Sequence, residues 1–122
     1  MISIIDDDGS VRAATSNLVR SVGYTVHTFA SAEEFLESCE LNGTSCVIAD
    51  VQMGKMSGIE LQAHLLAQGH YMPFIFITAY PIESVRASAH KVRATCFLTK
   101  PFDADALIEC IDAALEGPGQ DR

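Results

Sequence analysis

The stretch that decides the fold is Cys46-Val47-Ile48-Ala49-Asp50-Val51-Gln52-Met53. It is a short apolar run that ends at a carboxylate and is followed by Gly54, Ser57 and Gly58. An apolar run of this length, bounded by turn-forming residues, predicts a buried strand whose last residue emerges at the edge of the sheet. Asp50 is therefore expected at the carboxyl end of a strand, where open α/β sheets place their chemistry.

Four further apolar runs accompany this stretch, and helical patterns separate them. The predicted strands cover residues 2–5, 24–29, 46–50, 73–77 and 96–98, and the predicted helices begin near residues 11, 32, 58, 82 and 104. Five alternations of strand and helix imply a parallel sheet with helices on both faces. We expect an α/β, flavodoxin-like (βα)5 doubly wound fold with strand order 2-1-3-4-5, which places strands 1 and 3 side by side at the switch point.

Helix boundaries and buried faces follow from local signals. Ser31 with Glu34, and Ser57 with Glu60, have the spacing of capping boxes, and Gly23 has the position of a helix stop. Apolar residues at helical spacing predict the buried stripes. These stripes are Val11, Ala14, Leu18 and Val22 in the first helix, Ala32, Phe35, Leu36 and Cys39 in the second, and Leu107, Ile108, Ile111 and Leu115 in the last.

Length and charge limit the classes of protein to consider. The 122 residues suffice for one domain, predicted at residues 1–116, with residues 117–122 as a tail or the start of a linker. The net charge of −8 argues against a surface for nucleic-acid phosphates or an anionic membrane. The amino terminus has no basic region and reads as a strand rather than a signal peptide, and no apolar run approaches the length of a membrane span.

The four cysteines, at positions 39, 46, 96 and 110, have no paired spacing of the kind that zinc knuckles and redox motifs need. Cys46 and Cys96 lie within apolar runs. We therefore expect buried reduced thiols, which fit a cytoplasmic location.

Polar side chains close four of the predicted strands. In the expected order, Asp6, Asp7, Asp50, Thr78 and Lys100 meet at one edge of the sheet. Crowded carboxylates repel one another unless a cation neutralises them, and oxygen ligands suit Mg²⁺. A carboxylate beside a hard cation, a hydroxyl and an ammonium group is a set of parts for phosphoryl transfer, with the carboxylate as nucleophile.

In these features the sequence resembles the receiver domain of two-component response regulators, over residues 2 to about 116. The motifs that carry the resemblance are Ile4-Ile5-Asp6-Asp7, Asp50-Val51-Gln52-Met53, Met56-Ser57-Gly58, Ile77-Thr78-Ala79 and Phe97-Leu98-Thr99-Lys100-Pro101-Phe102. Residues 23–36 look most like regulators that carry a helix-turn-helix DNA-binding output domain.

The resemblance implies a role for each site residue. Asp50 would accept a phosphoryl group from a phosphohistidine of a sensor histidine kinase. Asp6, Asp7 and Asp50, with the backbone carbonyl of Gln52, would hold Mg²⁺. Thr78 and the ring of Phe97 would move as a switch, and Lys100 would pair with Asp50 and later with the phosphate. Such a domain catalyses only its own phosphorylation and dephosphorylation, is cytoplasmic, and regulates transcription through an output domain that this chain does not contain.

Two positions depart from the family pattern. Gly54 stands where the family usually has Pro, and Arg93 stands where it usually has Gly. The predicted helix at 82–93 has a thin apolar stripe, so we expect phosphorylation to order it. Its Arg86, Lys91 and Arg93 form either an ordinary solvated face or a contact surface. That surface would serve an acidic partner or a phosphorylation-dependent homodimer through helix 4, strand 5 and helix 5.

Two other functions remain open from the sequence. Asp6-Asp7-Asp8-Gly9-Ser10 also resembles the start of haloacid-dehalogenase-type phosphatases, in which Asp6 would be the nucleophile. That function leaves Asp50 without a role and lacks a further acidic metal motif after Lys100. The other alternative is a pseudo-receiver, a module that binds partners without phosphate.

Overall fold

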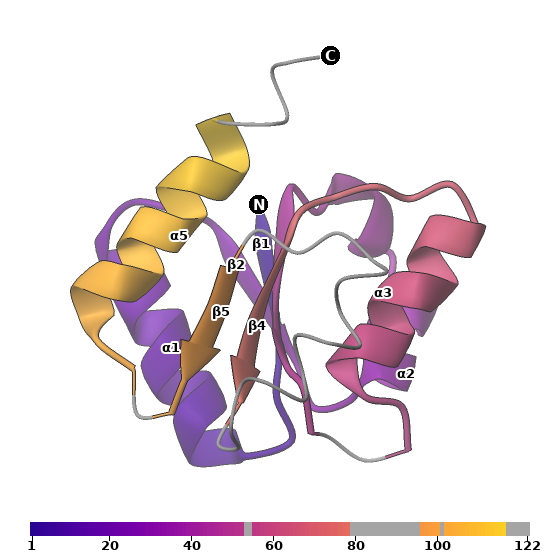
Figure 1. Cartoon of the computed structure of the whole chain (residues 1–122), viewed down its shortest axis with the longest axis horizontal. Helices are drawn as coiled ribbons and strands as arrows, with labels where there is room; N and C mark the ends of the chain where they lie inside the picture. Colours follow the sequence, from indigo (N-terminus) through magenta and orange to yellow (C-terminus); the bar gives the residue numbers. More distant parts are fainter. Residues whose placement is uncertain (53–54, 79–95, 101, 117–122) are drawn as a thin grey trace.

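The computed structural model describes residues 1–52, 55–78, 96–100 and 102–116. These residues form a parallel sheet with the order β2-β1-β3-β4-β5, which confirms the predicted topology (Figure 1). The strands are β1 (Ile2–Ile5), β2 (Val26–Phe29), β3 (Cys46–Asp50), β4 (Phe74–Thr78) and β5 (Cys96–Thr99). The helices are α1 (Gly9–Ser21), α2 (Ala32–Glu37), α3 (Gly58–Ala67) and α5 (Ala104–Glu116), with a short 3-10 helix, η1 (Leu41–Gly43).

Several predictions fall outside the described residues. These are the helix at 82–93 with its basic side chains Arg86, Lys91 and Arg93, the departure from the family pattern at Gly54, and the tail at 117–122. Among the residues that the structure describes, no helix is long and apolar enough to span a bilayer.

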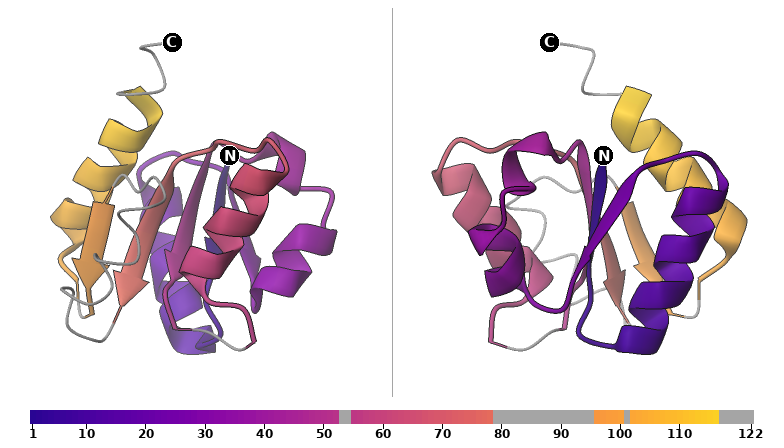
Figure 2. Two further views of the ribbon diagram at one scale, coloured as in Figure 1. Left: turned by 45° about the vertical axis from the view of Figure 1, so that its right-hand side comes forward. Right: turned by 180° about the vertical axis from the view of Figure 1, so that it is seen from behind.

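The helices cover the sheet on both faces. Helices α1 and α5 lie on one face, and α2 and α3 lie on the other (Figures 1 and 2). Side chains alternate between the two faces along each strand, so that Ile4 and Ile48 pack toward α1 and α5 whereas Ile5 and Val47 pack toward α2 and α3. The second face carries the aromatic residues Phe29, Phe35, Phe74, Phe76 and Phe97.

Local hydrogen bonds set the ends of the helices as the sequence predicted. Ser57 and Glu60 form a complete capping box at the start of α3. The Ser31 hydroxyl accepts a hydrogen bond from the Glu34 amide, although the Glu34 carboxylate accepts from the amide of Ala30 rather than that of Ser31. Gly23 stops α1 with a φ of 101°, in the left-handed region that favours glycine.

The predicted buried stripe of α1 is wrong in part. Val22 lies just past the helix and is 43% exposed, and Ala14 is exposed as well. The side of the helix that faces the sheet carries Thr15, Ser16 and Val19 instead, all of which are buried. The apolar periodicity was real, but it marked a neighbouring face of the helix. In α2, Cys39 lies beyond the last helical residue and is exposed, whereas the predicted Ala32 and Phe35 are buried.

The expectation of reduced thiols is also wrong for one pair of cysteines. Cys96 on β5 and Cys110 on α5 form a disulfide. Their separation of 14 residues is too long for the local spacings that identify zinc and redox motifs, so the pairing depends on the fold. Cys39 and Cys46 are free, and Cys46 is buried, which confirms Cys46 as a buried reduced thiol. Burial raises the pKa of the Cys46 thiol to about 12.

Two valines near the end of α1 test the corrected helix orientation. We expect Val19→Ala to lower the free energy of unfolding by about 2 kcal/mol, because Val19 is fully buried and the change removes two methyl groups and leaves a cavity. Val22→Ala should change it by less than about 0.5 kcal/mol, since Val22 is largely exposed. Urea unfolding measures both, and equal losses would contradict the orientation.

Candidate functional site

The carboxyl ends of four strands meet at one edge of the sheet and bring polar side chains together. Asp6 directly follows β1, Asp50 ends β3, Thr78 ends β4 and Lys100 directly follows β5. The strand register places Ile5 beside Ala49 and Asp50 beside Ile77. The convergence predicted from the strand ends is thus present in the structure.

Lys100 joins the carboxylates of two strands. Its ammonium nitrogen lies 2.8 Å from Oδ2 of Asp50 and 3.3 Å from Oδ2 of Asp6. Its backbone N–H donates to the carbonyl of Thr78 at 2.8 Å, which ties the base of the side chain to the end of β4. Burial alone would lower the pKa of Lys100, but the hydrogen bond and charge of Asp50, followed by those of Asp6, outweigh it and raise that pKa above its usual value. Lys100 is therefore cationic at neutral pH.

Backbone amides orient the two buried carboxylates. The amide of Asp8 donates to Oδ1 of Asp6 at 2.9 Å, and the amide of Gln52 donates to Oδ1 of Asp50 at 3.0 Å. In each carboxylate, one oxygen therefore contacts its own loop and the other contacts Lys100. Both side chains are nearly inaccessible, with Asp6 3% and Asp50 6% exposed.

The negative charge at this edge exceeds the positive charge. Asp6, Asp7 and Asp50 can each offer a carboxylate oxygen such that the three atoms lie within 4.8 Å of one another. Burial is the main cause that raises the pKa of Asp6, and the charge of Asp50 adds to it; together they outweigh the Asp8 amide and Lys100. A cluster of hard oxygen donors with surplus negative charge is the donor set that Mg²⁺ prefers.

Gly58 allows α3 to begin directly against the residue that carries the central carboxylate. A Cβ atom at this position would lie 2.6 Å from the backbone oxygen of Asp50 and 3.4 Å from Cβ of Ala49. The N–H of Gly58 donates to the carbonyl of Val51 at 3.1 Å. The requirement for glycine is therefore steric, because the backbone of α3 approaches the end of β3 too closely for a side chain.

The other predicted site residues lie around this cluster. Thr78 is fully buried and lies one residue beyond the partner of Asp50 on β4. Gln52 is exposed and holds Asp50 through its backbone amide. Phe97 is half-buried on β5, and its ring stacks on that of Phe76 with a centroid distance of 5.4 Å.

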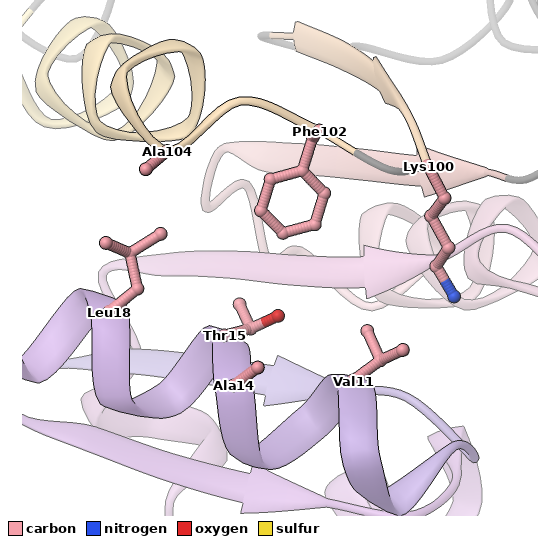
Figure 3. A pocket seen from close by; sticks show the side chains of 7 residues that line it. All are labelled: Val11, Ala14, Thr15, Leu18, Lys100, Phe102 and Ala104. Atoms are coloured by element: carbon pink, nitrogen blue, oxygen red, sulfur yellow. The ribbon is translucent and has the colours of Figure 1, made fainter.

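One contact and one cavity near the site were not predicted. The Arg12 guanidinium on α1 donates to the backbone carbonyl of Asp6 at 2.7 Å, although in sequence Arg12 looks like any charged residue on a solvated helix. Between α1 and the segment after β5 lies a largely apolar cavity of about 450 Å³. Its lining consists of Val11, Ala14, Thr15, Leu18, Lys100, Phe102 and Ala104, with Phe102 facing α1 and Lys100 at one end (Figure 3). This cavity explains where much of the apolar stripe of α1 points.

Comparison with known protein families matches residues 2–112 to the response regulator receiver domain. Response regulator protein TodT of Pseudomonas putida is 40% identical over 122 residues, which are all of this chain and 54% of TodT. Transcriptional regulatory protein TdiR of Thauera aromatica is 37% identical over 114 residues, or 93% of this chain and 50% of TdiR. The chain thus spans about half the length of these curated relatives.

The similarity extends to solved structures. The structure of response regulator StyR superimposes with a TM-score of 0.87 and is 41% identical in sequence. The match covers 99% of this chain and 61% of the StyR chain.

The steric role of Gly58 predicts the effect of adding one methyl group. We expect Gly58→Ala to lower the free energy of unfolding by about 1–3 kcal/mol, because the new Cβ forces α3 away from the end of β3. Gly9→Ala is the matched control, since its Cβ meets the Arg12 guanidinium at 3.5 Å, an ordinary contact. Urea unfolding of both variants measures the difference, and a Gly58 variant as stable as the Gly9 variant would refute the steric role.

The raised pKa of Asp6 predicts how stability depends on pH when EDTA removes divalent cations. A carboxyl whose pKa in the folded state exceeds its ordinary value of 3.8 binds its proton more tightly when folded. Its contribution to stability is therefore full below that ordinary value and is lost as pH rises through the folded pKa. Asp6→Asn replaces the carboxyl with a side chain that stays uncharged at every pH. Its free energy of unfolding should therefore match that of the wild type in acid and exceed it increasingly toward neutral pH.

Urea unfolding across a pH series checks this difference. Asp105→Asn is the control, because it removes the same charge from an exposed position in the first turn of α5. If the difference in free energy of unfolding between the wild type and Asp6→Asn stays constant with pH, the raised pKa of Asp6 is contradicted.

Proposed function

Since this chain belongs to the response regulator receiver family, we propose that it is a phosphorylation switch in which Asp50 accepts a phosphoryl group from a sensor histidine kinase. The observation that carries the proposal is the contact of Lys100 with Asp50 at 2.8 Å within the cluster of Asp6, Asp7 and Asp50. A nucleophilic carboxylate, acidic groups suited to a cation and a cationic side chain are thereby present in one place.

The reaction is a transfer between two groups that both bind phosphate covalently. A carboxylate oxygen of Asp50 attacks phosphorus, the new O–P bond forms, the P–N bond of the phosphohistidine breaks, and the histidine nitrogen leaves with its electron pair. Lys100 has three N–H donors, two of which face Asp50 and Asp6, so a third can reach a phosphoryl oxygen. In dephosphorylation, water attacks phosphorus, the O–P bond to Asp50 breaks, and inorganic phosphate leaves. The carboxylate of Asp50 is thereby restored.

The acidic residues supply the ligands for the cation. Asp6, Asp7, Asp50 and the backbone carbonyl of Gln52 would hold Mg²⁺, and their oxygen-only chemistry fits it. When bound, Mg²⁺ neutralises charge on the phosphoryl oxygens. The amides of Asp8 and Gln52 keep the two buried carboxylates oriented toward the same point.

The proposed switch residues lie on the two strands that follow β3 in the sheet, β4 and β5. Thr78 ends the strand beside β3, and its hydroxyl would donate to a phosphate oxygen. Phe97 lies on the next strand, and its half-buried ring would turn further inward as Thr78 moves. Phosphate thereby biases a two-state equilibrium rather than building a new structure.

The relatives indicate the setting in which the switch works. Receiver domains of response regulators interact with sensor kinases and act as signalling domains rather than as conventional enzymes. By analogy with the transcriptional regulator TdiR, the output of this protein would be transcription, through a DNA-binding domain outside this chain, in the cytoplasm. We also propose a phosphorylation-dependent homodimer through the helix predicted at 82–93, β5 and α5.

Two alternatives make different chemical predictions. A haloacid-dehalogenase-type phosphatase would use Asp6 as nucleophile, but Asp6 lies further from the Lys100 ammonium nitrogen than Asp50 does, and the family match favours the receiver. A pseudo-receiver would not be phosphorylated at all. The cluster of Asp6, Asp7 and Asp50, with Lys100 in contact with Asp6 and Asp50, supports a chemically competent site.

Phosphorylation by acetyl phosphate with Mg²⁺ tests the proposal. We expect the wild type to gain an acyl phosphate that hydrolyses in acid and in base, and borohydride reduction followed by peptide mass spectrometry to place it on Asp50. Asp50→Asn should remove the label, because an amide cannot form the acyl phosphate.

Asp105→Asn is the control, since Asp105 is an exposed carboxylate in the first turn of α5 and does not belong to the cluster of Asp6, Asp7 and Asp50. A label that persists in Asp50→Asn and maps to Asp6 would favour the phosphatase alternative. No label in the wild type with any small phosphodonor would favour the pseudo-receiver.

A further inference from the structure

The disulfide between Cys96 and Cys110 ties the edge strand β5 to α5, at the end of β5 that is opposite to the site. It joins the first residue of β5 to the middle of α5, and the Cα atoms lie 6.0 Å apart, within the range that a disulfide spans. Cys96 is partly exposed, and Cys110 is 8% exposed. The two other cysteines, Cys39 and Cys46, are not part of it.

The closed loop contains residues on which the switch depends. Lys100, which contacts Asp50 and Asp6, lies between the two cysteines in sequence. Phe97 is the neighbour of Cys96 and points to the opposite face of the sheet, where it stacks on Phe76. A covalent bond at Cys96 therefore restrains the strand that carries Phe97 and the segment that carries Lys100.

A disulfide in a domain proposed to be cytoplasmic needs an explanation. In a reducing compartment, disulfides are mostly transient or redox-sensing rather than structural. The domain also has a large core without it, since apolar clusters fill both faces of the sheet. The bond is thus better suited to regulation than to holding the fold together.

We propose that Cys96 and Cys110 form a reversible dithiol–disulfide site that controls the phosphorylation switch. In the oxidised form, β5 stays fixed on α5 with Lys100 at Asp50 and Phe97 stacked on Phe76. Reduction releases this restraint and allows β5 to rearrange when Asp50 is phosphorylated. The control of phosphorylation rests on the function proposed above, whereas the thiol chemistry does not.

The reductant of the proposed site is a dithiol, and its oxidant is a low-molecular-weight disulfide. A thiolate of an external dithiol attacks Sγ of Cys96, the more exposed sulfur, and the S–S bond breaks with Cys110 leaving as a thiolate that takes up a proton. The second thiol of the reductant then resolves the mixed disulfide and frees Cys96. The protein gains two thiols, and the reductant becomes a disulfide. A low-molecular-weight disulfide such as oxidised glutathione reverses both exchanges.

Thiol trapping tests the site itself. The protein is equilibrated in reduced and oxidised glutathione buffers or with a dithiol, then denatured and alkylated, and the peptides are analysed by mass spectrometry. We expect Cys96 and Cys110 to lose their reactivity toward the alkylating reagent together as the buffer is made oxidising. Both should become alkylatable again after reduction. Cys46 should remain alkylatable throughout after denaturation, because its burial keeps it from exchange in the folded protein.

Phosphorylation and hydrogen exchange test the restraint. After removal of the thiol reagents, the reduced wild type should be labelled by acetyl phosphate faster than the oxidised form, on the order of fivefold or more. Amides of β5 should exchange more slowly in the oxidised form. Cys96→Ser and Cys110→Ser should each abolish both differences, whereas Cys39→Ser, a change at an exposed free thiol, should keep them.

Two results would overturn the proposal. One is that Cys96 and Cys110 stay alkylatable in every oxidising buffer. The other is that the disulfide forms but leaves both the labelling rate and the exchange of β5 unchanged. If neither redox form accepts phosphate, the function proposed for Asp50 fails, and hydrogen exchange of β5 still decides whether the disulfide restrains the strand.

Discussion

The structure depends on an imbalance of charge at the carboxyl end of a parallel sheet. Two carboxylates, Asp6 and Asp50, contact the ammonium group of Lys100, and Asp7 lies close enough to form an acidic cluster with them. Two of these carboxylates are almost completely buried, so solvent screens their repulsion poorly. Backbone amides and Lys100 offset part of this electrostatic repulsion. The negative charge that they leave uncompensated favours binding of a cation at the site.

The fold supports this imbalance by rigid packing beneath it. The apolar strands β1, β3 and β4 are buried along their whole length, and helices cover both faces. The glycine at position 58 brings α3 against the end of β3, and Arg12 holds the carbonyl of Asp6 from α1. The site is thus built on strand ends that cannot easily move, while β5, at the edge of the sheet, is less buried and carries Phe97. That difference in burial would allow a change at Asp50 to be transmitted through β5, the strand at the edge of the sheet.

Much of the fold and the convergence at Asp50 could be predicted from sequence, because both follow from local patterns. Apolar runs that end in polar residues mark the strands, and parallel topology then brings their ends together. The helix α1 shows the limit of this reasoning. Its periodic residues Val11, Ala14 and Leu18 line a cavity, whereas the buried residues of the helix are Thr15, Ser16 and Val19, of which Thr15 also lines the cavity. Periodicity identifies a face of a helix but does not say what that face contacts.

Contacts between different helices and strands were beyond sequence reasoning for the same physical reason. The pairing of Cys96 with Cys110 and the bond from Arg12 to Asp6 depend on how α5 and α1 sit on the sheet, which no local spacing encodes. The Arg12 contact holds the backbone of a carboxylate residue of the charged cluster, whereas the disulfide lies at the far end of the strand that precedes Lys100. They are features of this chain that the phosphorylation function proposed for it would have to accommodate.

A crystal structure of the protein with Mg²⁺ and beryllofluoride, a stable mimic of a phosphoryl group, would test the central claim most directly. We predict beryllium bonded to a carboxylate oxygen of Asp50. We also predict a metal ion ligated by Asp6, Asp7, Asp50 and the carbonyl of Gln52, with Lys100 in contact with a fluorine atom. Beryllofluoride bonded to Asp6, or a cluster that binds neither the metal ion nor the mimic, would contradict it.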